Sequence, residues 1–136
     1  MIMRHSTGKP PDGLYGRLRA KFGIDWDDPK VAIFITYGDT VYSKYPLTPD
    51  LEIHEGTHIK QQEAIGKERW WDLYIENKKF RLSQEVEAYR NQIKFMKENY
   101  DRKKRKEVEK WIYYEMVFLY GDMCASEDEA KKLLNG

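Results

Sequence analysis

The sequence predicts one α+β domain that is mostly helical and carries a small antiparallel β-hairpin or sheet. Its 136 residues fall within the usual size of a single domain. Apolar residues recur at helical spacing through most of the chain, and only one short region is rich in β-branched residues. Because 14% of the residues are aromatic, we expect a small core built on large side chains, although 35% of the residues are charged.

The N-terminal segment combines glycine and proline with few apolar residues. We therefore expect residues 1–11 to form a flexible arm and residues 12–136 to form the single domain. Asp12 stands where it can cap a short helix that ends at Gly23. This helix is the first element expected in the domain.

A β-hairpin and a series of helices follow. Residues 31–36 and 41–45 have strand patterns, and the glycine and aspartate between them suit a turn. Thr48 and Pro49 supply an N-cap and a first helical residue, so a helix is expected over residues 49–66. Further helices are expected over residues 70–80, 83–99 and 108–120, and after a capping box formed by Ser126 and Glu129.

The composition excludes several classes of protein. The longest strongly apolar run, residues 31–35, is far shorter than the roughly 18–20 residues that span a bilayer. Residues 1–11 lack the apolar region of a secretory signal, so we expect a cytoplasmic protein without membrane contact. A net charge of +1 gives no overall attraction to nucleic acid, and the basic residues 103–106 are typical of a solvated helix start. Because Cys124 is the only cysteine, any metal must be held by nitrogen and oxygen.

The helix expected over residues 49–66 carries the HExxH pattern His54-Glu55-Gly56-Thr57-His58. Histidines four positions apart stand one turn apart on the same helix face, so both imidazoles can reach one metal ion. Glu55 lies about 100° around the helix from His54, beside the ion, where it can accept a proton from water. The pattern therefore predicts metal ligands at His54 and His58 and a catalytic base at Glu55.

A catalytic zinc ion needs a third protein ligand, and the only other histidine is the distant His5. Two carboxylates, Glu85 and Glu87, lie in the helix expected over residues 83–99. Helical phase places Glu85 on the apolar face of that helix and Glu87 on the polar face. Because an inward-facing acid is costly without a partner, we predict Glu85 as the third ligand, with a salt bridge from Glu85 to Arg81 as the alternative.

These residues resemble the gluzincin branch of the zinc metallopeptidases, in which two histidines and a glutamate hold the metal. The run His-Glu-Gly-Thr-His-Ile-Lys-Gln-Gln is also similar to small HExxH proteins often met in phage and prophage genomes. The resemblance covers about residues 33–96. It implies a minimal zincin-like fold with the hairpin or sheet beside the active-site helix, a Zn²⁺ cofactor on His54, His58 and Glu85, and Glu55 as the general base.

One position departs from the gluzincin pattern. Many gluzincins place Asp four residues after the ligand Glu, where it supports a metal-bound histidine, and here that position is Tyr89. Tyr89 and Tyr114 are candidates for polarising a scissile carbonyl, although core packing is the more ordinary role for both. Gln61 and Gln62 either bond to the ligands or the substrate, or simply make the end of the helix polar.

The leading hypothesis is zinc-dependent hydrolysis of a peptide bond in a peptide or protein substrate, with Glu55 as the base. The strand over residues 41–45 would offer its edge to an extended substrate. A zinc-stabilised binding or structural protein without turnover is the alternative, and nucleic-acid binding through residues 103–106 is a third hypothesis. Both a monomer and a homodimer stay open, because the helix over residues 108–120 has a broad apolar surface.

Overall fold

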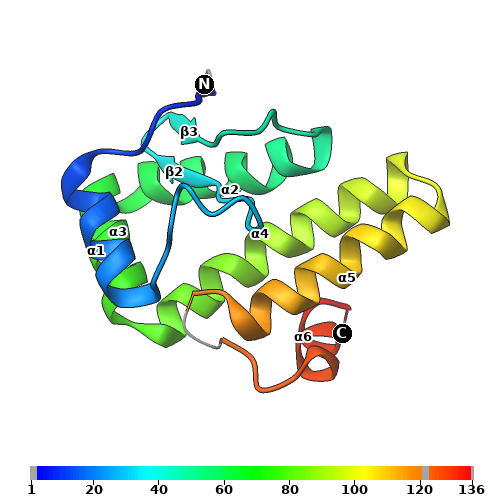
Figure 1. Ribbon diagram of the computed structural model, residues 1–136. Helices are drawn as coiled ribbons and strands as arrows, with labels where there is room; N and C mark the ends of the chain where they lie inside the picture. Colours follow the sequence, from blue (N-terminus) through cyan, green and yellow to red (C-terminus); the bar gives the residue numbers. More distant parts are fainter. Residues whose placement is uncertain (1–2, 121–122, 136) are drawn as a thin grey trace.

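The computed structural model describes residues 3–120 and 123–135 (Figure 1). Six helices dominate the described part of the chain, and a small three-stranded sheet lies beside them. The prediction of a mostly helical α+β fold with a small sheet is therefore confirmed. In chain order the elements are β1 (Arg4–Ser6), α1 (Asp12–Phe22), β2 (Ile35–Tyr37), β3 (Thr40–Tyr42), α2 (Pro49–Ile65), α3 (Lys67–Glu76), α4 (Lys78–Asn99), α5 (Arg102–Phe118) and α6 (Glu127–Asn135).

The sheet has the strand order β1-β3-β2. Strands β2 and β3 pair antiparallel and form the predicted hairpin, with Gly38 in the turn at a φ of 65° that favours glycine. Both strands are shorter than predicted, and residues 31–34 lead into β2 without strand structure. Strand β1 pairs parallel to β3, with His5 opposite Val41. The prediction of a flexible arm over residues 1–11 is therefore wrong for Arg4–Ser6, because the backbone of these residues bonds to the other side of β3. The first two residues of that arm lie outside the described residues.

The open edge of the sheet is not the one that the sequence indicated. Strand β3, within the expected strand over residues 41–45, lies in the middle of the sheet, so the prediction that it offers an edge to substrate is wrong. Both of its sides are already paired with neighbouring strands. Strand β2 is the edge strand on the side of the hairpin.

The bounds of α3, α4 and α5 differ from the predictions. Helix α3 begins at Lys67, three residues before its predicted start, and two capping side chains set the other boundaries. The Asn77 side chain accepts a hydrogen bond from the backbone N–H of Phe80 at 3.0 Å, so α3 ends and α4 begins here and not at residue 83. Asp101 caps α5 in the same way, accepting from the Lys104 N–H at 2.8 Å. Helix α5 therefore begins several residues before the predicted start at residue 108.

The other helices agree closely with the sequence analysis. Gly23 ends α1 in the left-handed conformation, at a φ of 67°. Helix α2 begins at Pro49 and ends before Gly66, as predicted. Ser126 accepts a hydrogen bond from the Glu129 N–H at 3.1 Å, which is the main bond of the predicted capping box at the start of α6.

Buried side chains form two clusters. The first joins α1, α3 and the segment that leads into β2, with Leu18, Ile35 and Trp70 among its members. The second joins α4, α5 and α6 and contains Met96 and Met116. Cys124 is buried in the second cluster, as expected. Neither cluster includes a described residue of α2, which packs along α4.

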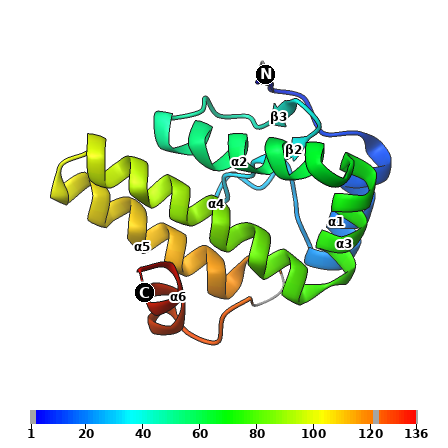
Figure 2. The ribbon, with the colours of Figure 1, turned by 180° about the vertical axis from the view of Figure 1, so that it is seen from behind.

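Helix α4 is central to the arrangement, with α2 along one side and α5 along another (Figures 1 and 2). Side-chain pairs along the α2–α4 seam show that the two helices run antiparallel, since His58 contacts Glu85 and Asp50 contacts Gln92. Within the described residues, no helix is long and apolar enough to cross a membrane. The seam is where the predicted site residues meet.

Candidate metal centre

Helix α2 presents two histidines from adjacent turns on one face. His54 and His58 are each only 5% exposed, and their Nε2 atoms lie 3.1 Å apart. The two rings meet nearly edge to face, with an interplanar angle of 85°. The four-residue spacing therefore brings both Nε2 atoms to one point, as the motif predicts.

Helix α4 adds a carboxylate at the same point. Oε1 of Glu85 lies 2.9 Å from Nε2 of His58 and 3.2 Å from Nε2 of His54. Glu85 is 4% exposed whereas Glu87 is exposed, as helical phase predicts. The alternative of a salt bridge to Arg81 is wrong for the described residues, because the guanidinium of Arg81 donates instead to the carbonyl of Tyr74 at 2.6 Å.

The dimensions of this group fit a zinc ion. Ligand atoms of a tetrahedral zinc ion lie roughly 3.3 Å apart when each metal bond is about 2.0–2.1 Å long. The three separations among His54 Nε2, His58 Nε2 and Glu85 Oε1 are 3.1, 2.9 and 3.2 Å. Two imidazole nitrogens and one carboxylate oxygen are also a donor set that zinc accepts. These three side chains would therefore hold the ion.

The electrostatics of the group favour a positive charge. Burial lowers the pKa of His58, but the adjacent Glu85 carboxylate outweighs burial and raises this pKa to about 9. Burial likewise raises the pKa of Glu85, but the His58 imidazolium and the hydrogen bonds from both histidines hold it well below its usual range. A divalent cation would take over the charge-neutralising role of the proton on His58.

Two further side chains orient the ligands. Nδ1 of His58 lies 2.8 Å from Oε1 of Gln61, and the hydroxyl of Tyr74 donates to Oε2 of Glu85 at 2.6 Å. Each bond leaves the other atom of the ligand, His58 Nε2 or Glu85 Oε1, directed at the centre. Of the two glutamines, Gln61 therefore bonds to a ligand, whereas Gln62 bonds to the sheet through the Thr36 carbonyl at 2.7 Å.

His54 is held differently from His58. Among the described residues, its buried Nδ1 has no hydrogen-bond partner. Its ring packs against that of Tyr89, with centroids 4.4 Å apart. Tyr89 therefore supports His54 by packing at the position where many gluzincins carry Asp, and its hydroxyl is directed to Glu115 at 2.6 Å.

Glu55 lies beside the ligand group and outside it. Its Oε1 is 3.9 Å from Nε2 of His54, and its Oε2 accepts a hydrogen bond from the Thr36 hydroxyl at 2.6 Å. Thr36 belongs to β2, so the edge strand of the sheet fixes the orientation of this carboxylate. Glu55 is only 4% exposed, and the bond from Thr36 is the one hydrogen bond of its side chain within the described residues, so that bond is important for its position.

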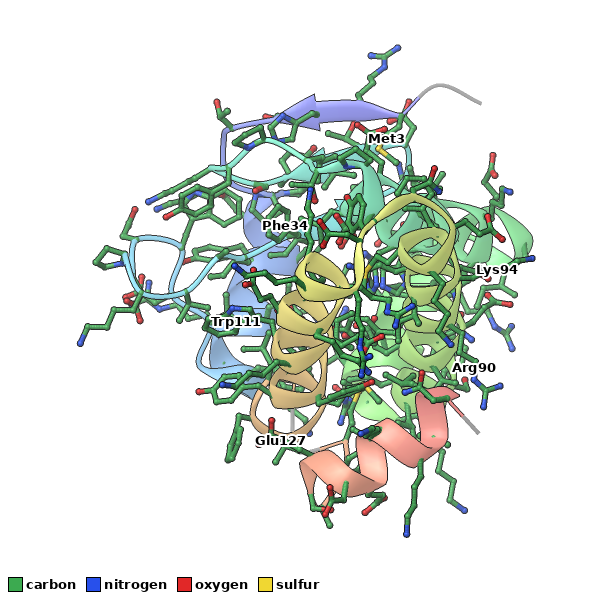
Figure 3. The ribbon with its side chains drawn as sticks, turned by 90° about the vertical axis from the view of Figure 1, so that its right-hand side faces the viewer. Met3, Phe34, Arg90, Lys94, Trp111 and Glu127 are labelled. Carbon is green, nitrogen blue, oxygen red and sulfur yellow. The ribbon has the colours of Figure 1, made fainter. Side chains whose placement is uncertain are left out.

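A cleft of about 260 Å³ reaches this group of side chains. Its walls include the segment before β2, one face of α5 and the start of α2. Figure 3 shows Phe34 and Trp111, two lining residues, along the side of α5 that is turned away from α4.

Tyr114 is 45% exposed on α5 and is not among the described lining residues of the cleft. Neither of the two roles considered for it, core packing and polarisation of a substrate carbonyl, therefore fits its position.

Sequence reasoning missed several residues of the site. Thr36, Tyr74, Gln92 and Glu115 all line the cleft, and each comes from a different element. No local pattern marks these positions, because tertiary packing alone brings them to the cleft. Gln61, by contrast, is already a candidate from the sequence, since a side chain three positions after His58 lies on the same helix face.

No family model matches the chain, and no curated protein or solved structure shows significant similarity to it. Function is therefore inferred from the geometry of the site. The motif residues His54, Glu55 and His58, together with Glu85, lie within one buried group at the cleft.

Proposed function

We propose that the chain is a zinc-dependent peptidase with a minimal zincin-like fold, which hydrolyses a peptide bond. The observation that carries this proposal is the convergence of His54, His58 and Glu85 at a cleft, with Glu55 beside them and outside the ligand group. Three protein ligands suit a catalytic zinc ion, because such an ion keeps its fourth position for water or substrate.

The residues of the chain support a hydrolytic mechanism. Zinc held at this point would polarise a substrate carbonyl and lower the pKa of a water molecule to about 7. Oε1 of Glu55 faces the ligand group and takes a proton from the attacking water, while Thr36 holds Oε2 at 2.6 Å. As the new C–O bond forms and the C–N bond breaks, Glu55 returns the proton to the departing amine nitrogen.

A zinc-stabilised binding or structural protein without turnover is the second candidate. The burial of the ligands favours it, since His54, His58 and Glu85 are each no more than 5% exposed. Structural zinc sites are usually closed by four protein ligands, however, and the ligand group found in the described residues contains three. The cleft beside the group also gives a substrate access to it.

Substitution of Glu55 separates the two candidates. Glu55→Gln should still bind one zinc ion per chain by elemental analysis, because Glu55 is not a ligand. Cleavage of a peptide library by the zinc-loaded variant, followed by mass spectrometry, should fall by at least about 100-fold through loss of the base. Glu52→Gln, on the exposed side of the same helix, is the matched control and should cleave like the wild type.

Two results would contradict the proposal. A wild-type cleavage rate in Glu55→Gln would remove Glu55 from the mechanism. No cleavage of any library member by the zinc-loaded wild type would overturn the peptidase function and favour the structural alternative.

A further inference from the structure

The cleft extends beyond the candidate metal centre along α4. Glu85, Tyr89 and Gln92 follow one another on the same face of this helix and all line the cleft. Opposite them, α2 contributes Asp50 and His54 from the corresponding turns. The metal ligands therefore occupy only one end of a longer polar surface.

Gln92 presents an acceptor without a partner. Its Nε2 donates to Oδ2 of Asp50 at 2.7 Å, and Oδ1 of Asp50 receives the hydroxyls of Thr48 and Tyr100, each at 2.7 Å. Because a carboxylate only accepts, the amide nitrogen must face Asp50 and the amide oxygen must point away from it. Gln92 is 2% exposed, and its Oε1 has no hydrogen-bond partner among the described residues. A buried acceptor of this kind requires a donor from a ligand or from water.

Glu115 adds a carboxylate to the same cleft from α5. The Tyr89 hydroxyl donates to it at 2.6 Å, and no Lys, Arg or His pairs with it in the part of the chain that the structure describes. Burial raises the pKa of Glu115 to about 7, although the hydrogen bond from Tyr89 and the nearby His54 ring both act to lower it. At pH 8 the carboxyl group of Glu115 is therefore ionised in most molecules.

The charge balance of the cleft is negative. Its described lining residues include four carboxylates, those of Asp50, Glu55, Glu85 and Glu115, against two cations at pH 8, Lys104 and the His58 imidazolium, whose pKa is raised to about 9. Lys104 lies eleven positions before Glu115 on α5, which is roughly 16 Å along a helix that rises about 1.5 Å per residue. A divalent ion at the metal centre would offset two of the negative charges. Excess negative charge would still remain near Glu115.

We propose that the cleft binds a primary ammonium group of its substrate at Glu115, with Oε1 of Gln92 as a second acceptor. The proposal rests on the proposed function only in taking the substrate to be a peptide. In a peptide this group is either the free α-amino terminus or a lysine side chain. The apolar wall that includes Phe34 and Trp111 would receive the neighbouring side chain (Figure 3).

Binding of a small amine tests the proposal independently of catalysis. The probes are phenethylammonium and its neutral counterpart 2-phenylethanol, titrated into the metal-free protein at pH 8 and followed by NMR chemical shifts. Glu115→Gln should weaken phenethylammonium binding at least about tenfold and leave 2-phenylethanol binding unchanged. The variant should fold, because a glutamine oxygen can still accept the Tyr89 hydroxyl.

Two further variants make this binding test specific. Glu107→Gln makes the same change on the exposed side of α5 and should bind both probes like the wild type. Glu115→Asp keeps the charge and should retain most of the preference for phenethylammonium. Equal phenethylammonium binding by the wild type and Glu115→Gln, or an equal affinity of the wild type for both probes, would overturn the proposal.

Peptide substrates distinguish the two sources of the ammonium group. If the α-amino group binds, acetylation of the peptide N-terminus should reduce kcat/KM at least about tenfold in the wild type and have little effect in Glu115→Gln. If a lysine side chain binds, the same fall in kcat/KM should come from replacement of that lysine by norleucine. It should again be seen in the wild type and be nearly absent in Glu115→Gln. Cleavage that depends on neither group overturns the proposal and leaves the peptidase function standing. Loss of phenethylammonium binding in Glu115→Gln, in a protein that cleaves no peptide, supports the ammonium site and overturns the peptidase function.

Discussion

Nδ1 of His58 donates to Oε1 of Gln61 across 2.8 Å, and this bond fixes which nitrogen of the imidazole faces the metal position. The direction of the bond follows from the other contacts of Gln61, whose Nε2 donates to the Gln84 carbonyl and to Glu87. With Nδ1–H used in this way, Nε2 of His58 is the atom that can bind an ion. No such contact holds His54 in the described part of the chain.

The contact between His58 and Gln61 predicts the effect of removing it. Gln61→Ala should lower zinc affinity by about 10–100-fold, the usual cost of removing a residue that orients a metal-bound histidine. Gln61→Glu should retain or tighten binding, because a carboxylate accepts the Nδ1–H more strongly. Competition with a chromogenic chelator measures both affinities.

The control for this experiment lies on the same helix. Glu63→Ala removes an exposed side chain of α2 and should leave zinc affinity unchanged. Wild-type affinity in Gln61→Ala would show that the packed surroundings of His58 hold the ring without this bond.

The ligand set predicts the stoichiometry of metal binding. Wild type should bind one zinc ion per chain, and His58→Ala or Glu85→Ala should each reduce zinc retention after dialysis to a small fraction of that value. Glu87→Ala is the matched control, because Glu87 lies on the exposed side of the same helix. Elemental analysis measures the zinc that each variant retains. If Glu87→Ala loses the metal and Glu85→Ala keeps it, the assignment of Glu85 as the third ligand is wrong.

Part of the site could be predicted because helical phase is a local property. The spacing of His54 and His58, and the difference between Glu85 and Glu87, follow from the geometry of one helix at a time. The approach of α4 to α2 could not be derived in the same way. Whether Glu85 reaches the histidines depends on packing between segments that are 27 positions apart.

The secondary structure could also be predicted only where its signal lies in neighbouring residues. The helix at Pro49 has its N-cap and proline signal in consecutive residues, and its predicted bounds hold. Arg4–Ser6 has no comparable signal in the sequence, because this three-residue strand is defined only by its backbone pairing with β3. Asn77 lies within the aromatic pattern that predicts a single helix over residues 70–80, and Asp101 precedes a charged run that comes before the apolar pattern at residue 108, so the predicted starts of α4 and α5 are too late.

Asp50 predicts a dependence of stability on pH. Burial raises its pKa, but the hydrogen bonds from Thr48, Tyr100 and Gln92 outweigh burial and lower it below the usual value. A carboxyl group with a lowered pKa stabilises the fold above its unfolded pKa of about 3.9, and this contribution is lost as the pH falls through the folded pKa.

Asp50→Asn tests that contribution. The variant should be less stable than the wild type at pH 7 by roughly 1–2 kcal/mol, because its amide offers fewer acceptors to the same donors. The difference should hold down to about pH 5 and narrow below pH 4, as the wild-type carboxylate is protonated. Urea unfolding at several pH values measures it. A difference that stays constant between pH 7 and pH 3 would show that ionisation of Asp50 does not stabilise the fold.

The metal centre joins two helices, which predicts a link between metal and stability. A zinc ion on His54, His58 and Glu85 connects α2 to α4, and binding to the folded state alone raises its stability. At a free zinc concentration about 100 times the Kd, the gain is roughly 2.7 kcal/mol, or a rise in Tm of about 10 °C for a domain of this size. The metal-free protein should still fold, because the two buried clusters do not contain the ligands.

Thermal unfolding followed by circular dichroism, with zinc or with a chelator, measures this link. Glu85→Gln should show nearly the same Tm in both conditions, because it keeps the bond to the Tyr74 hydroxyl but lacks the charged ligand. Glu87→Gln should behave like the wild type. An unchanged wild-type Tm would mean that no ion joins the helices. Complete loss of helical signal in chelator would mean that the metal is required for folding, because the clusters around Trp70 and Met96 would then be insufficient without it.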